Sequence, residues 1–557
     1  MAQRVMYDVT KFSSLREMLE IAKAQAGDNI AFKFKKNGEV QSISYNRFYE
    51  DVYALGTELA SRGISGTHIA CVGENSYKWV NIYLAVLCSD SVFVGIDKEL
   101  PPENLGKYAD FLNILKESDS EVLFYWRKTE DIIKEHMDEL GKIKLFIGID
   151  RTEDDGQFLA LDSFIEHGRE LYKNGDKSYI SMQNDPEKMK MLVYTSGTTG
   201  IAKGVMLSEK NLVACVYNGL RVSTIYTTGL SLLPYHHTYE AVCGLLVGLH
   251  KHVTICINES LRAVAKNLAL YKPDYMYVVP AVASALHKNV IRTAKKQGKL
   301  GALEFMIKVS NGLRKVGIDI RKKAFASVHA GLGGRLRKVV CGGAPVPVDT
   351  AKFFDDIGIA LINGYGITEC SPLVSANADS DNDFRTVGYP LPCVELKIEN
   401  KDEDGIGEIC VKGDTVMLGY YKRPDLTAEV IKDGWFSTGD FGYINKRGQL
   451  VITGRKKNII VLDNGKNIYP EEIEEYIYTL AYVKEVVVYD YDDNGKKELC
   501  AEIFPDNELL EGADVNADIC RVLSELPSYK QITKIVMRDK EFIKNTSQKI
   551  KRGEIHK

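Results

Sequence analysis

The chain has 557 residues, of which 45% are hydrophobic and 27% charged, the proportions of an ordinary globular protein. This composition excludes a disordered, collagen-like or coiled-coil protein, and the length corresponds to roughly three to four domain-sized units. The net charge of −4 at pH 7 provides no overall basic field for nucleic acid, so we expect no nucleic-acid partner.

The eleven cysteines include no pair at Cys-x-x-Cys spacing, which favours free thiols in a reducing compartment. The first residues show no apolar segment behind a basic head, so no secretory signal is predicted. No apolar stretch reaches the ~20 residues that a membrane-spanning helix needs. We therefore expect a large soluble protein of the cytoplasm, for which an enzyme is the favoured class, with peripheral contact to a membrane left open.

Helix and strand patterns alternate through most of the chain. Apolar spacing predicts helices over 15–26 and 46–62, which glycines at 27 and 63 terminate. Short apolar runs predict buried strands at 69–72, 122–125, 145–147, 191–194, 339–341 and 359–362. Such interleaving predicts an α/β fold with parallel strand pairing.

The pattern changes after about residue 388. Short β-like runs at 394–398, 406–411 and 450–452 predict a small β-rich subdomain over about 388–453. Beyond Gly454, a helix over 470–480 with an acidic first turn precedes strand-like runs at 486–489, 499–504 and 532–537. We predict a multi-subdomain N-terminal domain over 1–454, followed by a small, mobile α+β domain over 455–557.

The segment 194–204, Tyr-Thr-Ser-Gly-Thr-Thr-Gly-Ile-Ala-Lys-Gly, is the sharpest local signal for a binding site. Its glycines allow several backbone N–H groups to converge on an anion, while its hydroxyls and its lysine add donors and positive charge. A polyphosphate needs that combination of groups. The segment is not a Walker A loop, because Lys203 is followed by Gly204 and not by Ser or Thr.

Together with this loop, seven further motifs in a fixed order, spread over nearly the whole chain, resemble the signature of the adenylate-forming superfamily, which includes acyl-CoA synthetases, luciferases and adenylation domains of peptide synthetases. Besides the loop above, they are Leu-Pro-Tyr-His-His-Thr-Tyr-Glu at 233–240, Gly-Gly-Ala-Pro at 342–345, Gly-Tyr-Gly-Ile-Thr-Glu at 364–369, Gly-Trp-Phe-Ser-Thr-Gly-Asp at 434–440, Gly-Arg-Lys-Lys at 454–457, and the two C-terminal segments 465–474 and 546–552. The forms at 233–240, 342–345 and 465–470 lean toward medium- or long-chain fatty acyl-CoA synthetases.

This resemblance implies a reaction in two halves, which uses ATP, Mg²⁺ and coenzyme A. A carboxylate attacks the α-phosphorus of ATP and releases pyrophosphate, and a thiol then attacks the acyl-adenylate. It also implies roles for single residues. The expected phosphate ligands are Thr195, Ser196, Gly197, Thr198, Thr199, Gly200 and Lys203, and the other nucleotide-binding residues are Gly343, Ala344, Asn363, Tyr365, Gly366, Thr368, Asp440 and Arg455.

Within that set, Glu369 would ligate Mg²⁺ and Thr368 would donate to the α-phosphate. Tyr365 would lie against the adenine, with the backbone of Gly343 and Ala344 on its other side. Asp440 would accept from the ribose hydroxyls, because an ionised carboxylate suits that pairing, and Arg455 would assist.

The remaining expected roles concern catalysis and domain motion. Lys549 would place a cation between the carboxylate and the α-phosphate, while Lys457 would be the hinge and Gly465 would line the coenzyme A channel. His237 would lie beside the acyl carboxylate, although its neighbour His236 is distinguished only by alignment with the family pattern. Three departures from that pattern are Ala202 for a common Pro, Asn458 for an acid, and Gln548 for a frequent Gly.

Several alternatives stay open at this stage. The acyl-adenylate could pass to a separate acyl carrier protein in place of free coenzyme A, or the acid could be aromatic. From another class, the protein could be an inactive nucleotide-binding scaffold, although Lys203, Glu369, Asp440 and Lys549 argue against it.

Overall fold

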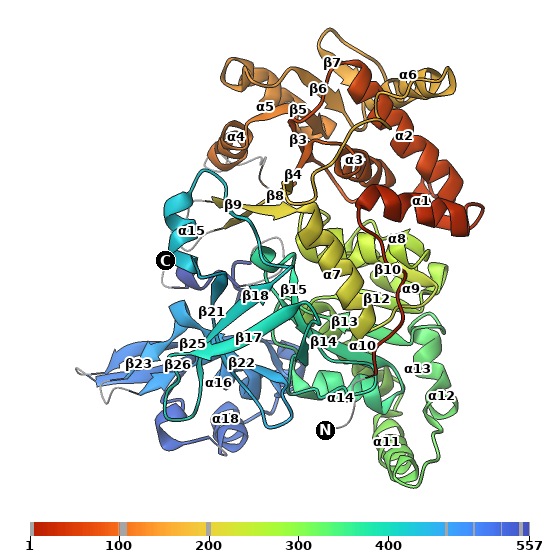
Figure 1. Cartoon of the computed structure of the whole chain (residues 1–557). Coiled ribbons are helices and arrows are strands. Elements are labelled where there is room, and N and C mark those ends of the chain that lie inside the picture. The colour runs from red at the N-terminus through yellow and green to blue at the C-terminus, as the bar shows by residue number, and fades with distance from the viewer. Residues whose placement is uncertain are drawn as a thin grey trace.

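The computed structural model describes residues 5–98, 100, 108–196, 202–462, 466–493, 496–524, 526–544 and 550–555. Two large sheets with flanking helices form the N-terminal part of the protein, and two smaller β units follow (Figure 1). The predicted α/β class, with a large multi-sheet region and a small C-terminal α+β unit, is confirmed.

The first large sheet has eight strands in the order β19-β9-β8-β4-β3-β5-β6-β7. Their bounds are Gly419–Tyr420, Ala202–Ser208, Met189–Ser196, Val92–Ile96, His68–Val72, Ser120–Tyr125, Leu145–Gly148 and Phe158–Ala160. The six strands from β8 to β7 are parallel, whereas β9 pairs antiparallel with both β8 and β19.

The second large sheet has nine strands in the order β16-β15-β14-β13-β12-β10-β11-β1-β2. Their bounds are Tyr389–Pro390, Leu373–Ala376, Ala360–Gly366, Lys338–Cys341, Tyr275–Val278, Thr228–Ser231, Thr254–Ile257, Ile30–Lys36 and Glu39–Ser44. The strands from β14 to β1 are parallel, and both edges are antiparallel.

Helices surround these two sheets and fill the space between them (Figure 1). Their bounds, from α1 to α15, are Leu15–Ala26, Tyr45–Ser61, Tyr77–Leu87, Tyr108–Glu117, Glu130–Glu135, Leu161–Lys173, Glu209–Val222, Val247–His250, Val264–Tyr271, Pro280–Lys296, Leu300–Arg314, Arg321–Ala324, Ala326–Gly331, Val348–Asp356 and Pro424–Val430. A π-helix at Tyr239–Leu246 precedes α8.

A five-stranded antiparallel sheet comes next, with β17 (Val394–Glu399), β18 (Gly407–Gly413), β21 (Trp435–Ile444), β20 (Ile431–Lys432) and β22 (Leu450–Arg455). The C-terminal unit follows. Its strands are β23 (Ile460–Val461), β24 (Asn467–Ile468), β25 (Val483–Asp493), β26 (Lys496–Pro505) and β27 (Lys534–Met537), and its helices are α16 (Pro470–Tyr478), α17 (Asn507–Leu510) and α18 (Val515–Leu523). This unit has its own hydrophobic core, built from residues between Ile460 and Leu523.

The predicted elements are present with small changes at their ends. The helix over 15–26 begins after Ser14, whose hydroxyl accepts from the Glu17 amide and so caps the first turn. The expectation of parallel pairing is confirmed for the six predicted strands, each of which has a parallel neighbour. The strands β2, β9, β15, β16 and β19, which were not predicted, pair antiparallel. An apolar run in the sequence indicates that a strand is buried, but it does not indicate whether the strand pairs parallel or antiparallel.

In the described part of the chain, no helix is long and apolar enough to cross a membrane. All eleven cysteines are free thiols, and nine of them are buried. No group of three or more His, Cys, Asp or Glu side chains within the described ranges could hold a metal ion by itself.

A buried ion pair fixes the amino end of β13. The Lys338 side chain, 1% exposed, contacts the Asp379 carboxylate, which also accepts from the Ser223 hydroxyl at 2.9 Å and the Tyr7 hydroxyl at 2.9 Å. Tyr7 belongs to the N-terminal arm, so this carboxylate joins the arm, α7 and the nine-stranded sheet.

We predict that Asp379→Ala destabilises the protein by about 3 kcal/mol, because it leaves a buried ammonium without its charge partner. The melting temperature measured by thermal unfolding should fall by several degrees. The control is the double variant Lys338→Met/Asp379→Leu, which removes both charges and should cost less. A single variant that melts with the wild type would show that the pair does not stabilise the fold.

Candidate active site

The predicted phosphate loop lies in a β-hairpin. Strand β8 ends at Ser196 and β9 begins at Ala202, and the two strands pair antiparallel, with Thr195 opposite Lys203. Gly197, Thr198, Thr199 and Gly200 lie outside the described residues. The sequence correctly placed a strand before the loop, but the second strand, which fixes where Lys203 lies, was not predicted.

A tyrosine that the sequence analysis did not identify connects Lys203 with Glu369. The Lys203 ammonium lies 5.3 Å from the centre of the Tyr420 ring, and the Tyr420 hydroxyl donates to Glu369 Oε1 at 2.9 Å. Burial, and secondarily the charge of Glu369, raises the pKa of Tyr420, so the phenol remains a hydrogen-bond donor. Tyr420 reaches this place because β19 pairs with β9.

Thr368 and Glu369 lie in a short turn, Thr368–Cys370, between β14 and β15. The preceding glycine is required by close packing: a Cβ atom on Gly366 would lie 2.3 Å from the Pro372 carbonyl oxygen. The turn therefore folds tightly back on itself and holds Glu369 beside β19.

The predicted ribose and adenine residues contact one another directly. The Tyr365 hydroxyl donates to Asp440 Oδ2 at 2.6 Å, and Arg455 Nε lies 2.8 Å from Asp440 Oδ1. Asp440 and Arg455 face each other in register across β21 and β22, and Asp440 is only 3% exposed. The Tyr365–Asp440 bond was not predicted, because it joins two different sheets.

The other predicted nucleotide residues lie around this group. Gly343 has φ +87°, which favours glycine, and it follows β13 where that strand ends next to β14. Ala344 is exposed. Asn363 is buried, and its side-chain amide donates to the Thr386 carbonyl at 3.3 Å, so this side chain supports the fold around β14.

The two neighbouring histidines differ in burial. His236 is 8% exposed, with Nε2 3.6 Å from Asp97, and burial lowers its pKa to about 3, so it is neutral at physiological pH. His237 is half-buried, and its ring centre lies 4.2 Å from that of His236. The more accessible ring is thus the one that the sequence predicted to meet the substrate.

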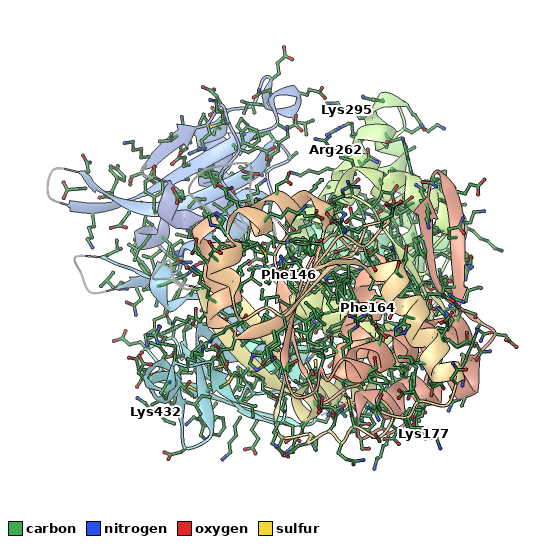
Figure 2. All side chains as sticks on the ribbon, turned by 90° about the horizontal axis from the view of Figure 1, so that it is seen from above. Phe146, Phe164, Lys177, Arg262, Lys295 and Lys432 are labelled. Atoms are coloured by element: carbon green, nitrogen blue, oxygen red, sulfur yellow. The ribbon has the colours of Figure 1, made fainter. Side chains whose placement is uncertain are left out.

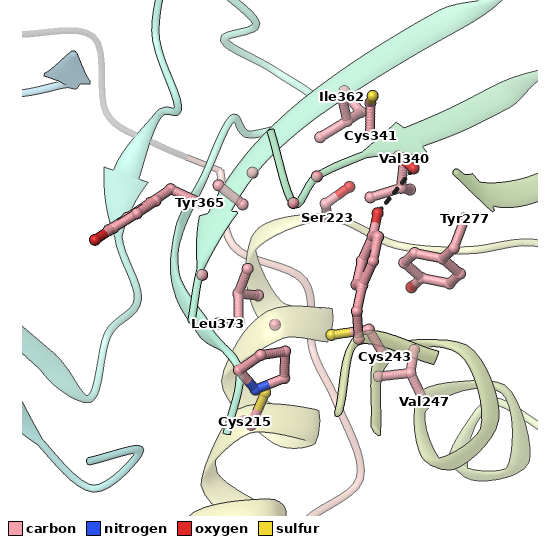
Figure 3. A pocket seen from close by; sticks show the side chains of 18 of the residues that line it. Cys215, Ser223, Cys243, Val247, Tyr277, Val340, Cys341, Ile362, Tyr365 and Leu373 are labelled. Carbon is pink, nitrogen blue, oxygen red and sulfur yellow. Dashed lines mark hydrogen bonds between the residues drawn. The ribbon is translucent and has the colours of Figure 1, made fainter. Parts of the chain in front are cut away.

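An apolar cavity extends from Tyr365 into the protein between α7, the π-helix and the nine-stranded sheet (Figure 3). Residues from α7 line one side, with Cys215, Gly219 and Ser223 spaced along one helical face. The Tyr239 hydroxyl donates to the Val340 carbonyl at 3.0 Å, so its polar atom is satisfied against the wall. Ser223, which also lines the cavity, contacts the Lys338–Asp379 pair.

The hinge segment is held by side chains of the C-terminal unit. Lys457 lies in the short turn Lys456–Asn458, directly after Arg455. The Asn458 amide contacts the Glu471 carboxylate in the first turn of α16, where an acid at position 458 would repel it. This contact gives a physical reason for one departure from the family pattern.

The described residues on either side of the predicted catalytic lysine contact strand β25. Phe542 N donates to Glu485 Oε2 at 2.8 Å before it, and Arg552 Nη1 donates to the Val488 carbonyl at 3.1 Å after it. Arg552 also contacts Glu474, whose pKa burial raises to about 7. Gly465, Gln548 and Lys549 themselves lie outside the described residues.

Comparison with known proteins shows the family to which the chain belongs. Residues 19–421 match the family model described as AMP-binding enzyme, and the chain belongs to that family of AMP-forming acid–thiol ligases. It is 28% identical to fatty acyl-CoA synthetase B of Dictyostelium discoideum, over 91% of this chain and 78% of the relative.

Two further comparisons concern a relative that uses a carrier protein and a solved structure. The chain is 30% identical to a chloroplastic long-chain-fatty-acid–[acyl-carrier-protein] ligase, AEE15, of Arabidopsis thaliana, over 61% of this chain and 54% of the relative. The structure of the anthranilate CoA ligase AuaEII in complex with anthranoyl-AMP has the same fold, with a TM-score of 0.78 at 18% identity, and covers 99% of this chain and 98% of that one.

Glu240 provides a test of the electrostatics beside the cavity. It is 1% exposed in the π-helix, its Oε1 accepts from the Ser231 hydroxyl at 2.6 Å, and burial raises its pKa to about 8. Because this pKa lies above the ordinary value of 4.5, the stability that the protonated carboxyl contributes is lost as pH rises from 4.5 through 8.

We therefore predict that Glu240→Gln, which cannot ionise, becomes more stable relative to the wild type as pH rises. The gain between about pH 6 and about pH 9 should be about 3 kcal/mol, measured by unfolding at several pH values. A difference in stability that does not change with pH would contradict a carboxyl that is neutral at pH 7.

Proposed function

We propose that this protein activates a fatty acid with ATP, forming acyl-AMP and pyrophosphate, and then transfers the acyl group to coenzyme A, forming acyl-CoA and AMP. The apolar cavity is the observation that carries the choice of acid. It begins at Tyr365, whose hydroxyl binds Asp440, so an aliphatic chain in the cavity would have its carboxyl end beside the nucleotide residues.

The nucleotide would be held by groups from three sheets. The β8–β9 hairpin and Lys203 would bind the β- and γ-phosphates, and Thr368 would donate to the α-phosphate. Asp440 would accept from the ribose hydroxyls. An ionised carboxylate has about four lone-pair sites, so Asp440 can accept these bonds while it keeps those from Tyr365 and Arg455.

The residues present suit a magnesium ion brought by ATP. Mg²⁺ in such sites is commonly held by one or two carboxylates together with substrate phosphates. Glu369 supplies one carboxylate near the phosphate hairpin, and the Tyr420 phenol donates to its Oε1. When bound, the ion would neutralise phosphate charge, and Glu369 would orient it.

Lys549 is proposed to stabilise the charge that develops between the attacking carboxylate and the α-phosphate. The C-terminal unit, which we propose to comprise residues 455–557, would then rotate at Lys457 and withdraw Lys549. In the second arrangement, Gly465 would line the channel for the coenzyme A thiol. His237 would lie beside the acyl carboxylate and gate the acyl pocket.

One other class of acid and one other thiol acceptor compete with this proposal. An aromatic acid is favoured by the likeness in fold to an anthranilate CoA ligase, and a carrier-protein thiol by the acyl-carrier-protein ligase among the relatives. The lining of the cavity is apolar, which supports an acid with an apolar tail.

Carboxylate-dependent exchange between ATP and pyrophosphate, measured without coenzyme A, tests the first half-reaction. The acids would be acetate, octanoate, palmitate, benzoate and an amino acid. We predict exchange with octanoate or palmitate above that with acetate and benzoate. Folded protein that binds ATP but exchanges with none of these acids would contradict the proposal, and exchange with benzoate alone would replace the aliphatic acid.

We predict that Lys549→Ala lowers adenylation by about 10²–10³-fold, the usual effect of one lost transition-state donor. Conversion of a supplied acyl-adenylate and coenzyme A to acyl-CoA should stay close to the wild-type rate. Lys551→Ala, two residues away and exposed, is the matched control for both half-reactions. Loss of both half-reactions in folded Lys549→Ala would refute the separate roles of the two arrangements.

A further inference from the structure

A helical hairpin far from the candidate active site carries a dense cluster of positive charge. Residues 288–323 contain eleven Lys or Arg and only two acids, in a chain whose net charge is −4. They include the second half of α10, all of α11 and most of α12, and Figure 1 shows α11 and α12 at the lower margin of the molecule. We call residues 295–323 the basic hairpin.

Most of this charge is not neutralised within the protein. The arginines pair with acids: Arg314 with Asp355 at 2.8 Å, and Arg321 with Asp319 at 2.7 Å. Seven lysines of the basic hairpin are exposed and form no ion pair with any described residue: Lys295, Lys296, Lys299, Lys308, Lys315, Lys322 and Lys323. The surface potential of the hairpin therefore comes from lysines that are free to meet an anion.

The same surface exposes large apolar side chains. Phe305 is 66% exposed and Val316 is 71% exposed, and Val309 and Ile318 are also exposed. Phe305 and Val309 lie four residues apart on one face of α11, with Lys308 between them. The opposite face, with Met306 and Ile307, packs against the hydrophobic core, so the outward apolar face is not part of the protein's own packing.

We propose that the basic hairpin docks on an anionic lipid bilayer. An interfacial helix combines exposed aromatic and aliphatic side chains with lysines, whose apolar stems lie along the hydrocarbon boundary while the ammonium groups reach the headgroups. Anionic headgroups attract clusters of four to eight basic residues strongly. A protein partner fits less well, because lysines are depleted from the buried centre of protein interfaces.

The docked face would comprise Phe305, Val316 and the lysines that surround them. This surface is separate from the nucleotide residues, so bilayer binding does not depend on which acid the protein activates. A sample that fails to bind bilayers can therefore be distinguished from one that lacks the proposed enzymatic activity, because the two properties are measured separately.

Sedimentation of the full-length protein with phospholipid vesicles tests the proposal. We expect binding to vesicles of phosphatidylglycerol and phosphatidylcholine, and at least about tenfold weaker binding to phosphatidylcholine alone. Raising the salt from about 0.05 M to about 0.5 M should weaken binding by a similar factor, because exposed charges are screened. Equal binding to both vesicle types would overturn the proposal.

Charge-reversal variants locate the surface. Lys308→Glu/Lys315→Glu should reduce binding to the anionic vesicles by at least about tenfold. The matched control, Lys177→Glu/Lys432→Glu, changes the net charge equally at exposed lysines that Figure 2 shows at the opposite margin from Lys295, and it should bind within about twofold of the wild type.

A third variant, Phe305→Ser/Val316→Ser, separates apolar insertion from charge attraction. It should bind anionic vesicles more weakly than the wild type while melting at the same temperature. Equal losses in the hairpin and control variants would overturn the proposal, as would binding of the hairpin to an acidic carrier protein without binding to vesicles.

Discussion

The Asp440 carboxylate is the point on which the arrangement of the site depends. It accepts from the hydroxyl of Tyr365, which lies near the carboxyl end of strand β14 in the nine-stranded sheet. It also contacts Arg455, the last residue of the five-stranded sheet. Arg455 is followed directly by the hinge segment. One buried carboxylate thus joins two sheets at the place where the C-terminal unit begins. A shift of either sheet would separate Asp440 from Tyr365 or from Arg455.

Around that carboxylate, polar and apolar surfaces meet at a single side chain. Tyr365 is one of the residues that line the apolar cavity, whereas its hydroxyl binds Asp440, a predicted nucleotide residue. On the polar side, Lys203, Tyr420 and Glu369 come from three separate segments and form a second set of contacts. The proposed reaction between a fatty acid and ATP would require such a boundary, since each substrate is poorly solvated in the other's environment.

The sequence predicted the local features of this structure better than the long-range ones. The helix at 15–26 follows from apolar spacing and the cap at Ser14, both of which are local. Strand direction at β9 and β15 depends on which edge is available once the sheet has formed, and an apolar run contains no such information.

The site shows the same division. Asp440, Arg455 and Glu369 could be named as candidate site residues from the sequence, because the motifs around them are local. Tyr420 was missed, since its segment has no distinctive pattern and its position depends on the pairing of β19 with β9. The burial that separates His236 from His237 and that shifts the pKa of Glu240 is equally a property of the folded chain.

The distribution of thiols has a practical consequence for observing motion in this protein. Cys520, on α18, is exposed, whereas Cys393 is half-buried and the other nine cysteines are buried. A maleimide fluorophore added to the native protein would therefore react first at Cys520 and mark the C-terminal unit without any engineered cysteine. Fluorescence anisotropy or energy transfer from that dye to a nucleotide analogue would then test whether the unit rotates as proposed.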